Sequence, residues 1–193
     1  VRVSVIGAAG EESAESPGAR HILHQFRPDA CIIGEPSGWD GVTLGYKGRL
    51  LLNATARVDQ HHSAGPDQSA CDLVHNWWQS ASAYVDSFNT SRERVYDRLQ
   101  ATILHMKAHT DGLAQTATLS AGLRLPPHID PHELESELTS LPAARALHFE
   151  SRGHEWAHAT DRNDPVVRAL SGAIREAGAR PRPKLKTGTA DLN

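Results

Sequence analysis

Short apolar runs separated by polar breaks dominate the first part of the chain. One run, residues 1–10, is followed by two adjacent glutamates, and a second run, residues 30–34, is followed by Glu35. Between the two runs, Ser16 and Pro17 are typical of a helix start, and apolar side chains then recur at helical spacing. The pattern predicts a strand, a helix and a strand, which is the unit that builds parallel sheets.

A longer apolar stretch, residues 42–58, is interrupted by Gly45 and Gly48. Its length predicts a strand that leaves the first layer, and we expect the chain to cross into a second domain near Gly48. From Pro66 onward, apolar residues recur every three or four positions, which predicts an amphipathic helix whose tryptophans lie in the core or in a subunit interface. The residues of this apolar stripe are Leu73, Val74, Trp77, Trp78, Ala81, Tyr84, Val85 and Phe88.

The middle of the chain continues with strand and helix patterns in turn. Strands are predicted at residues 101–109 and 117–125, a helix opens at Asp130 and Pro131, and a further strand is predicted at residues 146–150. Together with the preceding strand and helix, these elements follow the order strand, helix, strand, strand, helix, strand. That order is typical of a ferredoxin-like domain.

The last part of the chain predicts one helix and one strand. Asp164 and Pro165 begin a helix with one apolar face, Gly178 ends it, and a basic strand is predicted at residues 183–186. We therefore expect the chain to return to its first domain.

The predicted fold class is α/β with two domains. A catalytic domain built on a partial parallel sheet would comprise residues 1–47 and 154–193. A ferredoxin-like domain, residues 48–153, would be inserted between them and serve as a lid or dimerisation domain.

Composition narrows the function without identifying it. The 193 residues include 20 basic and 23 acidic side chains, a net charge of −3, and no basic block that would indicate nucleic acid or a membrane surface as a partner. Cys31 and Cys71 are isolated, which favours a reducing cytoplasm, and no apolar run is long enough to span a bilayer. Because the pattern begins inside a predicted strand, we expect a fragment of a longer protein.

Three carboxylates follow the first two predicted strands and suggest a metal site. Glu11 and Glu12 are adjacent, so one can bind a cation while the other faces a metal-bound water. Glu35 follows the second strand, and carboxylates at strand ends can converge on a divalent ion. A cation lowers the pKa of its bound water from about 15.7 toward about 7, and a neighbouring glutamate can take the proton. Hydrolysis is the leading hypothesis.

A histidine pair forms the second candidate. His61 and His62 begin a turn of small residues that ends at Pro66, and an imidazole there can donate to a developing oxyanion. The chain has 12 histidines. We expect the other ten to be surface or packing residues.

These motifs together resemble the zinc- or cobalt-dependent metallohydrolases that include acetylornithine deacetylase, succinyl-diaminopimelate desuccinylase and glutamate-releasing carboxypeptidases. The resemblance covers nearly the whole chain. It rests on Gly-Glu-Glu at residues 10–12, Gly-Glu-Pro-Ser at 34–37, His-Ser-Ala-Gly-Pro at 62–66, Leu-Arg-Leu-Pro-Pro at 123–127 and Gly-Thr-Ala-Asp at 188–191. The segments 17–20, 34–40 and 45–48 look most like the branch that hydrolyses lysine or ornithine from an amino-group carrier protein in lysine and arginine biosynthesis.

The resemblance implies roles for the catalytic and metal-binding residues. Glu11 would be the general base, and Glu12 and Glu35 would each bind one of two zinc or cobalt ions. His62 would stabilise the oxyanion across a homodimer interface formed by the lid domain, which completes the partner's site.

It also implies a substrate pocket. Arg124 would hold a substrate carboxylate with two donors, and Thr187, Gly188 and Thr189 would line the pocket. Lys47 and Lys186 are candidates for reading the charge of a carrier-protein tail, but we expect both to be solvated.

The chain departs from the family pattern at its ends. The family also uses an upstream His-x-Asp segment and a downstream histidine as ligands, and no residue here matches them. Catalytic zinc has three protein ligands, so we expect this chain alone to bind metal weakly and to be inactive. Alternatives within the family are an acetylornithine or succinyl-diaminopimelate deacylase and a carboxypeptidase. An alternative of another class is a noncatalytic dimerisation or binding module.

Overall fold

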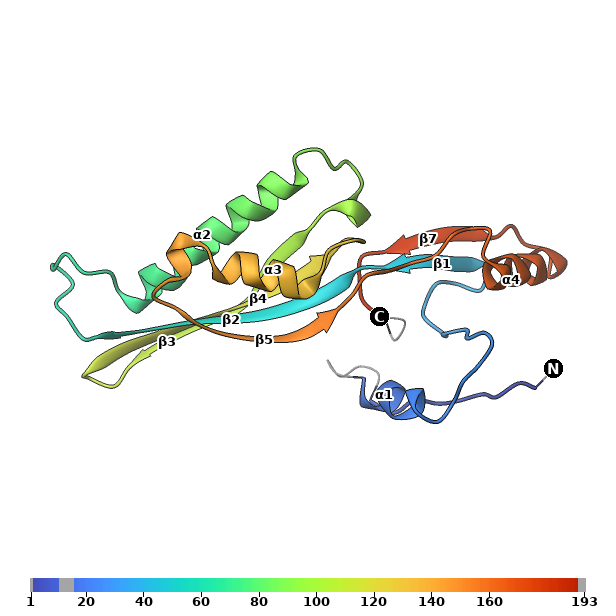
Figure 1. The fold of residues 1–193 in the computed structure, drawn as a ribbon, viewed down its shortest axis with the longest axis horizontal. Coiled ribbons are helices and arrows are strands. Elements are labelled where there is room, and N and C mark those ends of the chain that lie inside the picture. The colour runs from blue at the N-terminus through green and yellow to red at the C-terminus, as the bar shows by residue number, and fades with distance from the viewer. Residues whose placement is uncertain (1, 11–15, 191–193) are drawn as a thin grey trace.

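Two separate sheets lie one after the other along the longest axis of the molecule (Figure 1). The structure is a computed structural model that describes residues 2–10 and 16–190. Within those residues, the smaller sheet has three strands and the larger has four. The fold is a mixed α/β arrangement, as predicted.

The larger sheet has the strand order β3-β4-β2-β5, with every neighbouring pair antiparallel. Its elements follow the predicted order of strand, helix, strand, strand, helix, strand. They are β2 (Gly48–Asp59), α2 (Ala70–Asn89), β3 (Gln100–Thr110), β4 (Ala114–Leu125), α3 (Pro131–Thr139) and β5 (His148–Glu155). Two short 3-10 turns, η1 (Val95–Asp97) and η2 (Pro142–Ala144), complete this part of the chain.

The main core lies between this sheet and the helices α2 and α3. Alternate residues of β2 are buried, from Leu50 to Ala56, because successive side chains of a strand point to opposite faces. Trp77 of α2 is 1% exposed, its indole nitrogen donates to the carbonyl oxygen of Leu138 at 3.1 Å, and its ring meets Phe149 edge-on at 5.3 Å. Of the two places predicted for the tryptophans of α2, the core or a subunit interface, Trp77 therefore lies in the core.

The smaller sheet has the order β6-β1-β7 and a much smaller core. Strand β1 (Gly41–Tyr46) pairs in parallel with β7 (Arg182–Lys186) and antiparallel with β6 (His158–Ala159). The helix α4 (Pro165–Glu176) begins as predicted at Asp164, whose carboxylate accepts from the backbone of Val166 at 2.8 Å. A cluster of Val42, Leu44 and Ile174 joins α4 to β1.

The predicted strands at residues 1–10 and 30–34 are wrong. Residues 2–10 and 30–34 form no strand, and Val5 and Ile32 are 96% and 70% exposed. An apolar run becomes a strand only where a neighbour supplies backbone hydrogen bonds, and none of the described residues pairs with either run. The helix predicted between them is present as α1 (Pro17–Leu23), although the Ser16 side chain makes no capping hydrogen bond.

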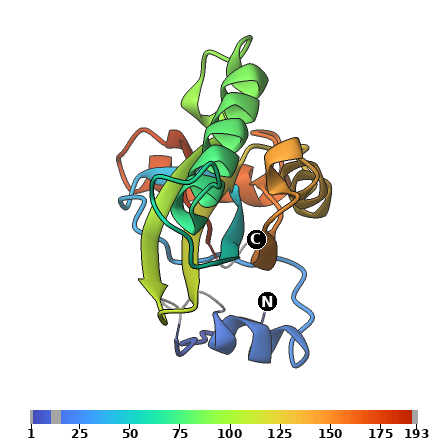
Figure 2. The same ribbon diagram turned by 90° about the vertical axis from the view of Figure 1, so that its left-hand side faces the viewer.

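Helix α1 lies apart from the other helices. Figures 1 and 2 both show it on the side of the larger sheet opposite α2 and α3. Arg20 of α1 donates to Glu155 at the end of β5, with 2.9 Å between Nη2 and Oε1. None of the helices in the described part of the chain is long and apolar enough to cross a membrane.

Candidate functional site

The chain passes from the smaller sheet to the larger one at Lys47, between β1 and β2. We call this crossing the junction and define it by residues 46–49. At Gly48 a Cβ atom would lie 2.2 Å from the carbonyl oxygen of Glu155, so only glycine allows these two backbones to approach. The Gly-Tyr-Lys-Gly segment recognised in the sequence therefore has a packing role at the junction.

Lys47 is buried, which corrects the expectation that it is solvated. Its side chain is 0% exposed, and its ammonium donates to the carbonyl oxygen of Arg98 at 2.5 Å and to Oε1 of Gln100 at 2.7 Å. Burial lowers the pKa of Lys47 to about 8, with Asp97 acting in the opposite direction and Arg124 adding to the decrease. Lys47 is thus a buried cation within the junction.

A row of charged residues crosses the larger sheet next to Lys47. Arg124 of β4 lies directly opposite Arg49 of β2, and Arg49 lies opposite Glu155 of β5. Like charges at directly opposed positions repel, and the 3.7 Å contact between Arg49 Nη2 and Glu155 Oε1 offsets part of that repulsion. Burial, and then Arg49, lower the pKa of Arg124. An anion beside this row would be favoured.

Two of the predicted substrate-binding residues meet at this row. Arg124 Nη1 donates to Thr189 Oγ1 at 3.0 Å, which brings the segment after β7 against the larger sheet. Gly188 and Thr189 are half-buried, whereas Thr187 is exposed. The structure therefore brings Arg124 into contact with Thr189, and Thr187 and Gly188 directly precede Thr189 in the sequence.

Glu35 lies near the ends of β1 and β7. Its Oε2 is 3.9 Å from Nζ of Lys186, which also donates to the carbonyl oxygen of Pro36 at 3.3 Å. Lys186 sits 5.6 Å from the Tyr46 ring and is half-buried, so it too is less solvated than expected. Although residues 30–34 form no strand, Glu35 still reaches the carboxyl ends of the parallel pair, where ligands of α/β sheets bind.

The remaining metal and base candidates, Glu11 and Glu12, lie outside the described residues. The described chain thus contributes one of the proposed metal ligands, Glu35, whose carboxylate is beside a lysine. A catalytic zinc ion takes three protein ligands. The described residues by themselves do not form the family's metal centre.

The loop between β2 and α2, which contains His62, lies at the end of the larger sheet away from the smaller one (Figure 1). The His62 ring is exposed, and its Nδ1 accepts from the backbone of Ala64 at 3.1 Å. The loop lines an open depression of about 480 Å³ together with Asp67 and Asp72. Strand β2 has 12 residues, which at about 3.3 Å each separate its ends by roughly 36 Å. Within one chain His62 and Arg124 do not share a site.

Sequence reasoning missed the buried state of Lys47 and the pairing of Arg49 with Arg124 and Glu155. The pairing depends on strand register, and the burial of Lys47 depends on its contacts with Arg98 and Gln100, so neither is fixed by the local sequence pattern. The available signal for Lys47 was its place inside a largely apolar stretch, residues 42–58.

The sequence is similar to known hydrolases. It is 40% identical over 195 residues to the LysW-lysine hydrolase of Deinococcus radiodurans, an alignment that covers 100% of this chain and 54% of that protein. The chain thus spans about half the length of the relatives it matches. No family model matches it.

Solved structures share the fold. Aminopeptidase PepT of Bacillus cereus matches 96% of this chain and 51% of its own, with a TM-score of 0.72 and 15% identity. An M20 family metallo-carboxypeptidase of Sulfolobus solfataricus matches 90% of this chain and 55% of its own, with a TM-score of 0.62 and 17% identity. The resemblance to the metallohydrolase family recognised in the sequence is confirmed.

Proposed function

Because this chain is homologous along its whole length to a LysW-lysine hydrolase, we propose that it is part of a metal-dependent amide hydrolase. The proposed reaction releases lysine or ornithine from an amino-group carrier protein in amino-acid biosynthesis. The division into a catalytic domain of residues 1–47 and 154–193 and an inserted domain of residues 48–153 belongs to the same proposal.

The structural observation that supports this proposal is the contact between Arg124 and Thr189. A released basic amino acid has a free carboxylate, and a guanidinium can bind a carboxylate with two parallel hydrogen bonds. Thr189 fixes one donor nitrogen of Arg124, and the repulsion from Arg49 favours an anion at that position. Arg124 would orient the carboxylate of the amino acid that leaves.

The proposed chemistry uses three carboxylates, those of Glu11, Glu12 and Glu35. Two divalent metal ions, zinc or cobalt, would be held in part by Glu12 and Glu35 and would supply an acidified water. Glu11 would take the proton of that water at its carboxylate and return it to the nitrogen of the departing amino acid. The upstream and downstream ligands that the family uses would come from outside this chain.

His62 has a separate place in the proposal. It would donate to the oxyanion of a second copy, because within one chain the length of β2 separates it from Arg124. The homodimer would form through the domain of residues 48–153.

The test compares variants of the complete protein that contains this chain. With lysine linked to the carrier protein as substrate, Glu11→Gln should abolish release of lysine while the metal content stays near that of the unchanged protein. Acetylornithine and succinyl-diaminopimelate should be poorer substrates. Undiminished turnover in Glu11→Gln would reject its role, and absence of hydrolysis for every substrate would favour a noncatalytic dimerisation or binding module.

A further inference from the structure

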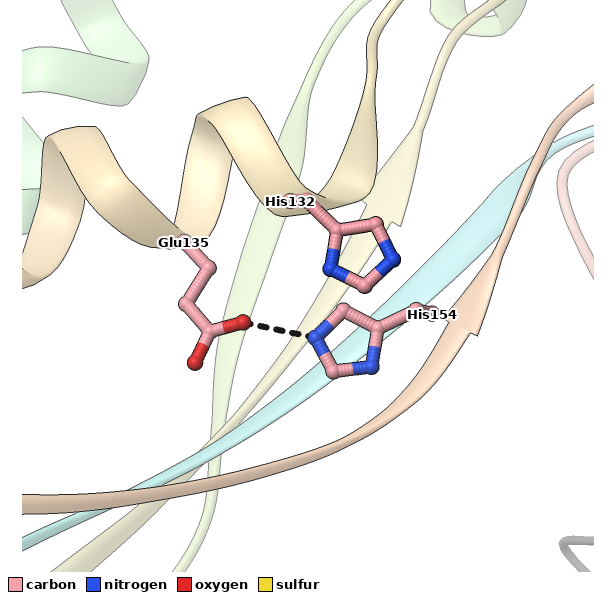
Figure 3. Close-up of side chains that lie close together, drawn as sticks. All are labelled: His132, Glu135 and His154. Atoms are coloured by element: carbon pink, nitrogen blue, oxygen red, sulfur yellow. Dashed lines mark hydrogen bonds and ion pairs between the residues drawn. The ribbon is translucent and has the colours of Figure 1, made fainter.

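A second group of ligand-type side chains lies between α3 and β5. Figure 3 shows His132 and Glu135 on α3 directed toward His154 on β5. Each of the three offers one ligand atom, and these atoms all lie within 4.8 Å of one another. The group uses none of Glu11, Glu12 and Glu35, and it includes two of the histidines, His132 and His154, that no sequence pattern singled out.

The helix brings two members of the group together. His132 and Glu135 are three positions apart, so they lie on the same face of α3. The start of this helix is fixed, because the Asp130 carboxylate accepts from the backbone nitrogen of His132 at 2.8 Å. The spacing and the cap together hold both side chains over β5.

A bulge in β5 brings the third member to the same place. Arg49 of β2 is opposite Glu155 and Leu51 is opposite Arg152, so Gly153 and His154 together face one residue of β2. Gly153 has a φ of +68°, a conformation that glycine adopts without strain. The extra residue turns His154 to the helix-covered face, where it meets Glu135. Bulges of this kind commonly re-aim a side chain at a functional position.

The three side chains are already in contact. His154 Nε2 lies 2.6 Å from Glu135 Oε2, and the rings of His132 and His154 stack with centroids 4.2 Å apart and planes 10° from parallel. Ser151, which precedes the bulge on β5, hydrogen-bonds to Glu135. The side chains of Glu135 and His154 are about one-quarter exposed, whereas His132 is exposed. A small ion therefore has an entry path from solvent.

We propose that His132, Glu135 and His154 bind one divalent transition-metal ion, Zn²⁺ in the first instance, which links α3 to β5. Two imidazoles and one carboxylate suit zinc and its neighbours, whereas calcium and magnesium prefer all-oxygen sites. With bonds of about 2.0–2.1 Å, tetrahedral ligands lie about 3.3 Å apart, so the ligand atoms would close by about 1.5 Å from their widest separation. Ser151 would orient the carboxylate from outside the ligand set.

The experiment is a calorimetric titration of the tag-free 193-residue chain with Zn²⁺, repeated with single variants. His132→Asn, Glu135→Gln and His154→Asn should each weaken binding at this site by more than about tenfold. Matched controls come from the same two elements: Glu133→Gln on the exposed side of α3 and His148→Asn on β5 should bind as the unchanged chain does. Glu35→Gln should also retain this binding.

The melting temperature provides a second measurement, separate from the binding affinity. At one fixed Zn²⁺ concentration, the Tm should rise clearly less for Glu135→Gln than for the unchanged chain and both controls, because a ligand bound only by the folded state stabilises it in proportion to its occupancy. Circular dichroism checks that each variant is folded. The proposal is overturned if the unchanged chain binds no Zn²⁺, if His154→Asn and Glu135→Gln bind it undiminished, or if Glu35→Gln alone removes binding.

Discussion

The two sheets of this molecule differ in how completely they are buried. The larger sheet is covered on one face by α2 and α3, and its core unites β2, β4 and both helices. The smaller sheet has a core of Val42, Leu44 and Ile174. Beside it, the exposed apolar runs at residues 2–10 and 30–34 lack strand partners among the described residues. The comparison indicates that the larger sheet carries the stability of this chain.

Buried charged side chains, unlike the apolar core, are concentrated near the smaller sheet. The buried Lys47, the row of Arg49 and Arg124, and the contact of Glu35 with Lys186 all gather where the smaller sheet meets the larger one. Buried or half-buried charges cost stability unless they are paired. The region with the smaller core is thus the region that holds the candidate chemistry, which is the usual relation between a scaffold and a site.

The largest change in the free energy of unfolding is expected from a substitution in the core of the larger sheet. Trp77→Ala should lower the free energy of unfolding by about 3–5 kcal/mol, because it removes a buried ring and its hydrogen bond to Leu138. Val42→Ala, in the smaller core, loses two methyl groups and should cost about 1.5 kcal/mol. Urea denaturation followed by circular dichroism measures both values. Equal losses would contradict the difference between the two sheets.

A pH titration of stability sharpens the comparison at the junction. The pKa of Lys47 is about 8 in the folded chain and 10.5 for an ordinary lysine, so between these values the unfolded chain holds a proton that the folded chain has lost. The free energy of unfolding should therefore rise with pH across this window. Below pH 8 both states are protonated and the cost of burying the charge is constant.

The matched experiment is Lys47→Met. At the top of the window this variant should lack an increase on the order of 3 kcal/mol that the unchanged chain shows, since 1.36 kcal/mol corresponds to each unit of pKa. Lys107→Met, at an exposed position of β3, is the control and should leave the pH dependence unchanged. Identical slopes for Lys47→Met and the unchanged chain would show that Lys47 is not the buried cation.

Much of the larger sheet could be predicted from the sequence. The stripe through Trp77 has helical periodicity, and Asp130 with Pro131 is a strong start signal, so α2, α3 and their flanking strands were found in the correct order. The runs at residues 1–10 and 30–34 were not, because an apolar run reports that burial is favourable but not which strand would pair with it.

The site was partly predictable for a similar reason. Arg124 and Thr189 were selected through the family resemblance, and the structure brings them to 3.0 Å. The position of Arg49 opposite Arg124 depends on strand register, and the position of His154 depends on a one-residue bulge at Gly153. Neither leaves a periodic signal in one sequence.

The most direct test of the account is the kinetics of Arg124→Gln in the complete protein, with lysine linked to the carrier protein as substrate. A charged hydrogen bond contributes about 1.5–3 kcal/mol. We therefore predict a fall in kcat/KM of about 10- to 100-fold, with the free energy of unfolding changed by about 1 kcal/mol or less, because loss of the hydrogen bond to Thr189 is offset in part by relief of the repulsion from Arg49. Arg57→Gln, which alters an arginine at the far end of β2, should leave both quantities unchanged. Full activity in Arg124→Gln, or an equal loss in Arg57→Gln, would contradict the claim that Arg124 binds the carboxylate of the substrate.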